Sequence, residues 1–191
     1  MTGLQFTIFG NPAHEGTYAL LVHVSKPLEL AFGRFQGGRV IAVPEGDYIY
    51  IGSALGGKRA GNPLAQRLLR HASRSDGKNH HAIRKSVENL FYDPATSHRN
   101  HISTGGKKLH WHIDYLLDCT EAEIDHIIII QSPRRLEENI SGLLGSLEET
   151  SLLAYRLGAQ DSRRSTHLLK LSSRENMFLN LRNAIPPLLE P

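Results

Sequence analysis

The chain has 191 residues, of which 40% are hydrophobic and 21% charged, values that are ordinary for one globular domain with one core. No unbroken apolar run is long enough to cross a bilayer, and the first eleven residues mix polar and apolar side chains, unlike a signal peptide. The single cysteine, Cys119, excludes an internal disulfide and a multi-cysteine zinc site, so we expect a cytoplasmic protein without a membrane partner.

The net charge of +3 is unevenly distributed along the chain. The segment from Lys58 to Lys108 has eleven Lys and Arg residues and three acidic residues, a net charge of +8, so the rest of the chain carries −5. Such a segment favours a polyanionic partner, because Lys and Arg that neutralise phosphates release counterions. A solvated loop whose charges maintain solubility has the same composition, so both interpretations stay open.

The first part of the chain predicts strands joined by short turns. Residues 1–15 predict a loosely held lead-in, and a buried strand follows at Thr17–Val24, where β-branched, aromatic and aliphatic residues predominate. Residues 28–43 predict a hairpin around Gln36-Gly37-Gly38, and residues 48–52 predict a further strand. Several strands within so short a stretch favour an antiparallel sheet.

A helix and a long polar segment come next. Asn62-Pro63 is a typical helix start, with Asn as N-cap and Pro at the first helical position, and apolar residues then recur with helical spacing as far as His71. The periodicity is lost after Ser73. The His-rich residues 76–107 therefore predict an inserted loop whose histidines are solvated.

The second half of the chain alternates between predicted strands and helices. Alternating residues predict a strand over residues 108–117, and the apolar run Ile127–Gln131 predicts another. Residues 137–157 show helical spacing, which we interpret as two helices with the second beginning near Ser146. Residues 168–171 predict a closing strand.

A last helix is predicted from Arg174 to Asn183, and Pro186-Pro187 is expected to stop it. No internal repeat or linker divides the sequence. We therefore expect a single domain over residues 1–191, with a core at about 16–171 and a tail at 172–191.

Short motifs lie on these predicted elements. Gly16-Thr17-Tyr18 lies on one strand, Tyr50-Ile51-Gly52 lies on a later strand, and Arg67 and His71 share a face of the following helix. Together these motifs resemble the signature of the GIY-YIG nucleases. Longer strings resemble the subfamily catalogued as domain of unknown function 123; they span residues 46–54, 109–116 and 158–168. The resemblance implies an α+β fold in which a small, mostly antiparallel sheet is flanked by helices and carries an inserted hairpin.

The resemblance also implies a metal-dependent nuclease that acts on DNA rather than RNA. The subfamily also occurs fused to DNA glycosylases, which implies a repair-related role. Carried over to this chain, the implied site has Tyr18 beside the attacking water, Tyr50 as the second strand tyrosine, Arg67 on the scissile phosphate, His71 assisting proton transfer, and Glu149, or alternatively Glu148, holding Mg²⁺ or Mn²⁺. A non-catalytic nucleic-acid-binding module on the same scaffold is the alternative.

Two further sets of residues are candidates around this site. Basic side chains that would contact nucleic acid are Lys58, Arg59, Arg67, Arg70, Arg74, Lys107 and Lys108. Residues that would support the site are Gly16, Gly52, His110, His112, Asp114, Asp161 and His167. On a strand, His110, His112 and Asp114 would share a face, so a two-histidine, one-carboxylate metal site stays open beside the interpretation that these side chains are only packed.

Overall fold

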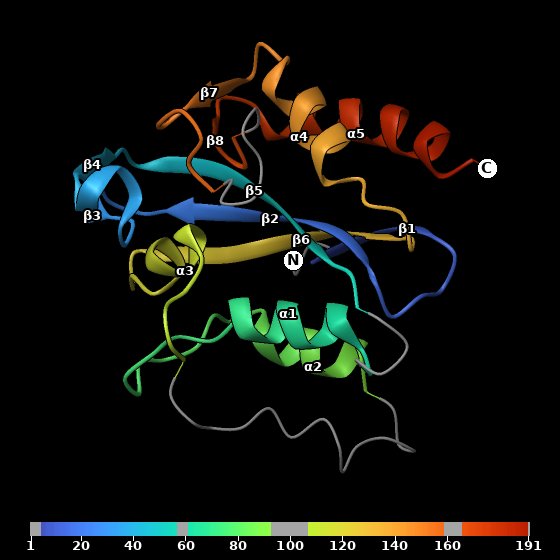
Figure 1. The fold of residues 1–191 in the computed structure, drawn as a ribbon, viewed down its shortest axis with the longest axis horizontal. Coiled ribbons are helices and arrows are strands. Elements are labelled where there is room, and N and C mark those ends of the chain that lie inside the picture. Colours follow the sequence, from blue (N-terminus) through green and yellow to red (C-terminus); the bar gives the residue numbers. More distant parts are fainter. Residues whose placement is uncertain (1–4, 57–60, 93–106, 159–165, 191) are drawn as a thin grey trace.

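A computed structural model describes residues 5–56, 61–92, 107–158 and 166–190 of the chain. A six-stranded sheet in the order β1-β6-β2-β5-β8-β7 lies at its centre, and β3 and β4 form a separate two-stranded sheet. The strands β1 and β6 are parallel, and the other pairs are antiparallel. The fold is α+β, with helices on both faces of the central sheet (Figure 1).

The elements have the following bounds. The strands are β1 (Phe6–Gly10), β2 (Gly16–Val24), β3 (Leu28–Ala31), β4 (Val40–Val43), β5 (Gly46–Ala54), β6 (Ala122–Gln131), β7 (Thr150–Leu152) and β8 (Leu168–Leu171). The helices are α1 (Pro63–His71), α2 (Arg84–Leu90), α3 (His112–Leu117), α4 (Glu137–Gly145) and α5 (Arg174–Leu189), and a 3-10 helix spans Phe35–Gly38.

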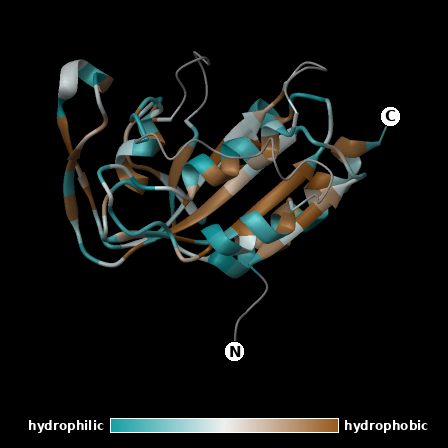
Figure 2. Cartoon of the chain, turned by 90° about the horizontal axis from the view of Figure 1, so that it is seen from below, coloured by the Kyte–Doolittle hydropathy of each residue, from teal (hydrophilic) through white to brown (hydrophobic). Residues whose placement is uncertain are grey.

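The sheet separates two hydrophobic clusters. On β2, Tyr18 and Leu20 face the cluster that includes apolar residues of α1, α2 and α3, whereas Ala19 and Leu21 face the cluster that includes residues of α4 and α5. Because successive strand residues point to opposite faces and both faces are covered, β2 is apolar along almost its whole length. Figure 2 shows largely hydrophobic strands at the centre, beside helices that carry both hydrophilic and hydrophobic residues.

Much of the predicted order of elements is confirmed. Strands are present at the predicted positions of β2, β5, β6 and β8, and β3 and β4 form the predicted hairpin, with Leu28 opposite Val43. The start of α1 is also confirmed, because the side chain of Asn62 accepts a hydrogen bond from the backbone N–H of Ala65 at 2.9 Å, with Pro63 as the first helical residue.

Three predicted elements are wrong. Residues 1–15 contain β1, which pairs with β6. Residues 108–117 contain α3 instead of a strand, and the apolar residues of α3 are buried on one helical face. The second half of residues 137–157 contains β7 instead of a helix, because α4 ends at Gly145 and the chain then pairs with β8.

The segment between α1 and α3 is more ordered than predicted wherever it is described. It contains α2, and His81 is only 2% exposed instead of solvated; its Nε2 lies 2.9 Å from the carbonyl oxygen of Leu117. Residues 93–106 of the predicted loop lie outside the described residues. Helix α5 continues to Leu189 through the two prolines that were expected to stop it. None of the helices described is both long and apolar enough to span a membrane.

Candidate functional site

One pocket of about 190 Å³ gathers side chains from several elements. Two strands, β2 and β5, contribute to it together with α1, α4, the residue before α3 and the segment before β8. Its lining residues are Tyr18, Tyr50, Gly52, Ser53, Leu55, Arg67, Trp111, Arg135, Glu137, Glu138, Gly158 and His167. The pocket therefore unites the two strand tyrosines and the helix arginine that sequence analysis singled out.

Tyr18 reaches the pocket from β2 because a glycine lies beside its hydroxyl. Tyr18 pairs with Gly52 of β5, and a Cβ atom at position 52 would lie 2.4 Å from the Tyr18 hydroxyl oxygen. Gly16, the first residue of β2, instead allows the backbone of β6 to approach closely, since a Cβ there would lie 2.1 Å from the carbonyl oxygen of Ile130. Burial, with a smaller contribution from Tyr50, raises the pKa of Tyr18 well above its usual value, so this side chain is a neutral phenol.

His71, the last residue of α1, lies next to Tyr18 and Tyr50. It is fully buried, and its Nε2 forms a hydrogen bond of 2.8 Å with the hydroxyl group of Tyr18. Its ring also packs against Tyr50, with ring centroids 5.9 Å apart. Burial lowers the pKa of His71 to about 4, so the imidazole is neutral at pH 7.

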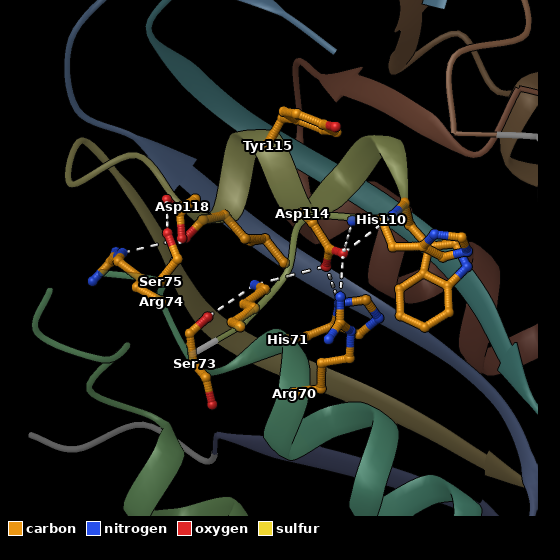
Figure 3. A network of polar contacts seen from close by, with 12 residues as sticks. Arg70, His71, Ser73, Arg74, Ser75, His110, Asp114, Tyr115 and Asp118 are labelled. Atoms are coloured by element: carbon orange, nitrogen blue, oxygen red, sulfur yellow. Dashed lines mark hydrogen bonds and ion pairs between the residues drawn. The ribbon is translucent and has the colours of Figure 1, made fainter. Parts of the chain in front are cut away.

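Asp114 in the first turn of α3 connects His71 to its surroundings (Figure 3). Its carboxylate is fully buried, forms an ion pair of 2.8 Å with Arg70, and lies 3.6 Å from Nδ1 of His71 and 3.7 Å from Nζ of Lys107. Burial alone would raise its pKa, but His71, Lys107 and a backbone N–H outweigh burial and hold the pKa well below the usual range. Asp114 is therefore an ionised carboxylate in the protein interior.

Arg67 lies at the pocket with its guanidinium group against an aromatic ring. Its Cζ atom is 3.9 Å from the ring centroid of Trp111, and Cζ of Arg70 is 4.8 Å from the same centroid. Such cation–π contacts stabilise a guanidinium group by about 0.5–2 kcal/mol and restrict its orientation. Arg67 is only half-buried, so its donors remain available to a ligand in the pocket.

The predicted carboxylate, Glu149, does not line this pocket. It lies just before β7, where its backbone oxygen accepts a hydrogen bond of 2.8 Å from the N–H of Ser172. The carboxylates at the pocket are those of Glu137 and Glu138 in the first turn of α4. The prediction of Glu149, with Glu148 as the alternative, rested on a second helix that the chain does not form.

Glu137 is held in place by His167, one of the residues predicted to support the site. Its Oε1 lies 2.9 Å from Nδ1 of His167, which is 4% exposed. Burial opposes ionisation of Glu137, but the interactions with His167 and with the hydroxyl group of Ser53 outweigh it and lower the pKa of the carboxyl group. Glu137 therefore presents a negative charge to the pocket at neutral pH.

Several predicted nucleic-acid contacts are occupied within the protein. Arg74 is 6% exposed and donates hydrogen bonds to three carbonyl oxygens, so the prediction that it contacts nucleic acid is wrong. The side chain of Lys107 is 4% exposed and donates a hydrogen bond to the carbonyl oxygen of Ser73, so the predicted contact of Lys107 with nucleic acid is not supported either. Arg70 is paired with Asp114, whereas Lys108 is exposed. Lys58, Arg59 and Asp161 lie outside the described residues.

The predicted metal arrangement of His110, His112 and Asp114 is absent because these residues belong to the start of α3 instead of a strand. Nδ1 of His112 accepts a hydrogen bond of 3.2 Å from the N–H of Gly158, and the ring of His112 packs against Phe35. His110 packs against Trp111, with ring centroids 5.0 Å apart. In the part of the chain that the structure describes, no three His, Cys, Asp or Glu side chains lie close enough together to hold a metal ion.

Seven lining residues of the pocket were not predicted from the sequence: Ser53, Leu55, Trp111, Arg135, Glu137, Glu138 and Gly158. The signal for Glu137 was present, because it opens the first helix after the central strand β6 and precedes apolar residues at helical spacing. Trp111 lies in the string of residues 109–116 that resembles the subfamily. Its contact with Arg67 joins two segments that are distant in sequence, so local periodicity could not predict it.

The comparison with protein families gives one result for the chain as a whole. A family model described as domain of unknown function DUF123 matches residues 17–189. Comparisons with curated proteins and with solved structures gave no significant match. The matched range includes every described residue of the pocket and covers most of the sequence. The chain therefore belongs to the DUF123 family.

Proposed function

We propose that this protein is a divalent-metal-dependent endonuclease of the GIY-YIG type, which hydrolyses phosphodiester bonds in DNA. The observation that carries the proposal is the pocket itself, in which Tyr18, Tyr50, Arg67 and an ionised glutamate, Glu137, meet. Hydrolysis of a phosphodiester needs a base for the attacking water, donors for the charge that develops on phosphate, and stabilisation of the leaving oxygen. These side chains supply groups suited to each task.

The phosphate group would bind to Arg67. A guanidinium group remains charged at all relevant pH values and can donate two parallel hydrogen bonds to phosphate oxygens. Stacking on Trp111 restricts the orientation of this fork before the substrate arrives. The exposed Arg135 adds a second positive charge at the same pocket.

The attacking water would be activated by Tyr18 together with His71. In one concerted step, the water transfers a proton to the phenol oxygen of Tyr18 while the phenol proton passes to Nε2 of His71. The resulting hydroxide attacks phosphorus, the bond to the leaving oxygen breaks, and solvent protonates that oxygen. This relay suits the raised pKa of Tyr18, because the tyrosine never has to exist as a free phenolate.

The residues present also fit a hard divalent cation. Magnesium and manganese prefer oxygen ligands, and Mg²⁺ commonly keeps several waters and takes only one or two protein carboxylates. Glu137 would hold the ion, since its carboxylate is ionised and lines the pocket, and Glu138 is the next carboxylate there. A bound Mg²⁺ or Mn²⁺ would neutralise charge on the phosphate and the leaving oxygen.

The proposal is tested by incubating the purified protein with supercoiled plasmid and Mg²⁺ or Mn²⁺. We expect nicked product from the wild type, and we expect Arg67→Ala and Glu137→Gln each to reduce the cleavage rate by about 10²-fold or more. Glu149→Gln is the matched control, because it removes a carboxylate that does not line the pocket, and it should cleave at the wild-type rate.

Two results would reject this proposal. Cleavage that survives both Arg67→Ala and Glu137→Gln would come from another site or from a contaminant. Salt-sensitive DNA binding without product under either metal would instead identify a binding module on the nuclease scaffold.

A further inference from the structure

The carboxylate of Asp114 lies next to Nδ1 of His71, while Nε2 of the same ring contacts Tyr18. The two nitrogen atoms of the imidazole therefore face two different groups, one on α3 and one on β2. Figure 3 shows Asp114 among the side chains of Arg70, His71 and His110. This arrangement raises the question of which nitrogen carries the single proton of neutral His71.

The two oxygen atoms of Asp114 have different surroundings. Oδ2 accepts hydrogen bonds from Nη2 of Arg70 at 2.8 Å, the N–H of His110 at 2.9 Å and the N–H of Trp111 at 3.1 Å. Oδ1 is buried without a hydrogen bond among the described residues, and so is Nδ1 of His71. These two atoms lie 3.6 Å apart, so a shift of a few tenths of an ångström makes each the partner of the other.

The chemistry of the two groups fixes the direction of that bond. An ionised carboxylate only accepts hydrogen bonds, so its partner nitrogen must carry the proton. Arg70 and Lys107 are the cations that face this carboxylate, and both favour its ionised form. Buried polar atoms without a partner are destabilising, so a bond between Oδ1 and Nδ1 is favoured over leaving both unpaired.

We propose that Asp114 is a positioning residue that keeps the His71 proton on Nδ1, so that Nε2 accepts the hydroxyl proton of Tyr18. The oxygen lone pairs of Tyr18 are then free for a donor from the pocket, such as water. With the opposite tautomer, Nε2–H would donate to the Tyr18 oxygen, and the relay of protons from water to His71 would be blocked. The catalytic consequence rests on the proposed nuclease function, whereas the tautomer itself does not.

The first test measures the tautomer directly in the ¹⁵N-labelled full-length protein. Long-range ¹H–¹⁵N spectra at pH 7 distinguish protonated from unprotonated ring nitrogens, and His71→Gln identifies the signals of His71 by their loss. We expect Nδ1 to be protonated and Nε2 to be unprotonated. A wild-type spectrum with the proton on Nε2 would overturn the inference whether or not the protein cleaves DNA.

Variants then show which residue fixes the tautomer. Asp114→Asn should shift the His71 population toward Nε2–H, because an amide group can donate to Nδ1. Tyr18→Phe should keep the proton on Nδ1, and loss of the Nδ1–H signal in that variant would assign the effect to Tyr18 instead. Asp118→Asn is the matched control, since this buried aspartate follows α3 but binds Ser75 and Lys78.

Kinetics provide a second readout. In Asp114→Asn we expect kcat for plasmid nicking to fall by about 10²-fold or more with little change in KM, as for a histidine held in the wrong tautomer. An unchanged kcat would overturn the positioning role. If Asp114→Asn does not fold, the wild-type and Tyr18→Phe spectra still decide the assignment. A wild type that has Nδ1–H but does not cut DNA would reject the nuclease proposal alone.

Discussion

Gly52 is the residue at which a single methyl group would disturb the pocket most directly. A Cβ atom there would lie 2.4 Å from the hydroxyl oxygen and 2.6 Å from Cζ of Tyr18, on strands that are fully paired. We expect Gly52→Ala to lower the free energy of unfolding by about 1–3 kcal/mol, as other overpacking substitutions do, and to displace the Tyr18 hydroxyl group. Urea unfolding monitored by circular dichroism measures the change.

The control for this prediction is Gly142→Ala in the middle of α4. A Cβ atom at Gly142 would have no heavy atom within 4 Å, and alanine restricts the unfolded chain more than glycine does. We expect this variant to gain about 0.5–1 kcal/mol of stability. Equal stability of Gly52→Ala and the wild type would show that the two strands can separate enough to admit a side chain.

At the residue scale, sequence reasoning worked where the relation between residues is local or periodic. Arg67 and His71 are four residues apart on a helix, which places both on one face, and both are near Tyr18 in the structure. It failed for Glu149, because its position depended on how far α4 extends and where the chain returns to the sheet. Spacing along the chain carries little information about such a return.

The end of α1 is joined to the neighbouring elements by a buried arginine, Arg74. Its guanidinium group donates to the carbonyl oxygens of Leu117 and Ala122 and forms an ion pair of 2.8 Å with Glu123 on β6. Arg74→Met would leave the carbonyl oxygens and the carboxylate without this donor. We expect a loss of about 3–5 kcal/mol in the free energy of unfolding, measured by urea denaturation.

Lys85→Met on α2 is the control for the Arg74 prediction. Its side chain is 79% exposed and forms an ion pair with Glu88 on the same helix, so the substitution should change stability by less than about 0.5 kcal/mol. A similar small effect for Arg74→Met would mean that solvent or other donors replace the guanidinium group.

At the scale of elements, the differences from the predicted order have a common cause. The strands β1 and β7 are short and partly exposed, and each exists because it pairs with a strand distant in sequence. The residues of α3 alternate polar and apolar at the start, which favoured a strand, yet Ile113, Leu116 and Leu117 have the i, i+3, i+4 spacing of a helix. Burial of these three residues against the core decides for the helix.

At the scale of the whole molecule, the sheet brings two separately packed layers of helices to one site. Arg67 and His71 come from the layer of α1, whereas Glu137 comes from α4 on the opposite face of the sheet. The central strands β2 and β5 contribute the two tyrosines between these layers. The pocket therefore depends on the packing of both faces of the sheet.

Because buried histidines resist protonation in the folded protein, stability should fall as the pH is lowered through the range in which histidines titrate. The pKa of His71 is lowered to about 4 by burial, and burial also lowers the pKa values of His81 and His112. In the unfolded chain these groups titrate near pH 6.5. Between that pH and about 4, the unfolded state binds more protons than the folded state, so acid favours unfolding.

The expected change for His71 alone is a loss of about 2 kcal/mol in the free energy of unfolding between pH 6.5 and pH 4.5. The measurement is a series of urea unfolding curves at intermediate pH values for the wild type and for His71→Gln. The slope of stability against pH is the readout, because the substitution also changes packing at every pH. His81 and His112 remain in the variant, so its slope should be reduced but not abolished.

Above pH 4.5 the ordinary carboxyl groups contribute little to the change in stability. Below pH 4.5 the depressed pKa values of Asp114 and Glu123 add a further loss. Identical slopes for wild type and variant would mean that His71 is protonated in the folded protein, which would also remove the neutral imidazole on which the proposed relay through Tyr18 depends.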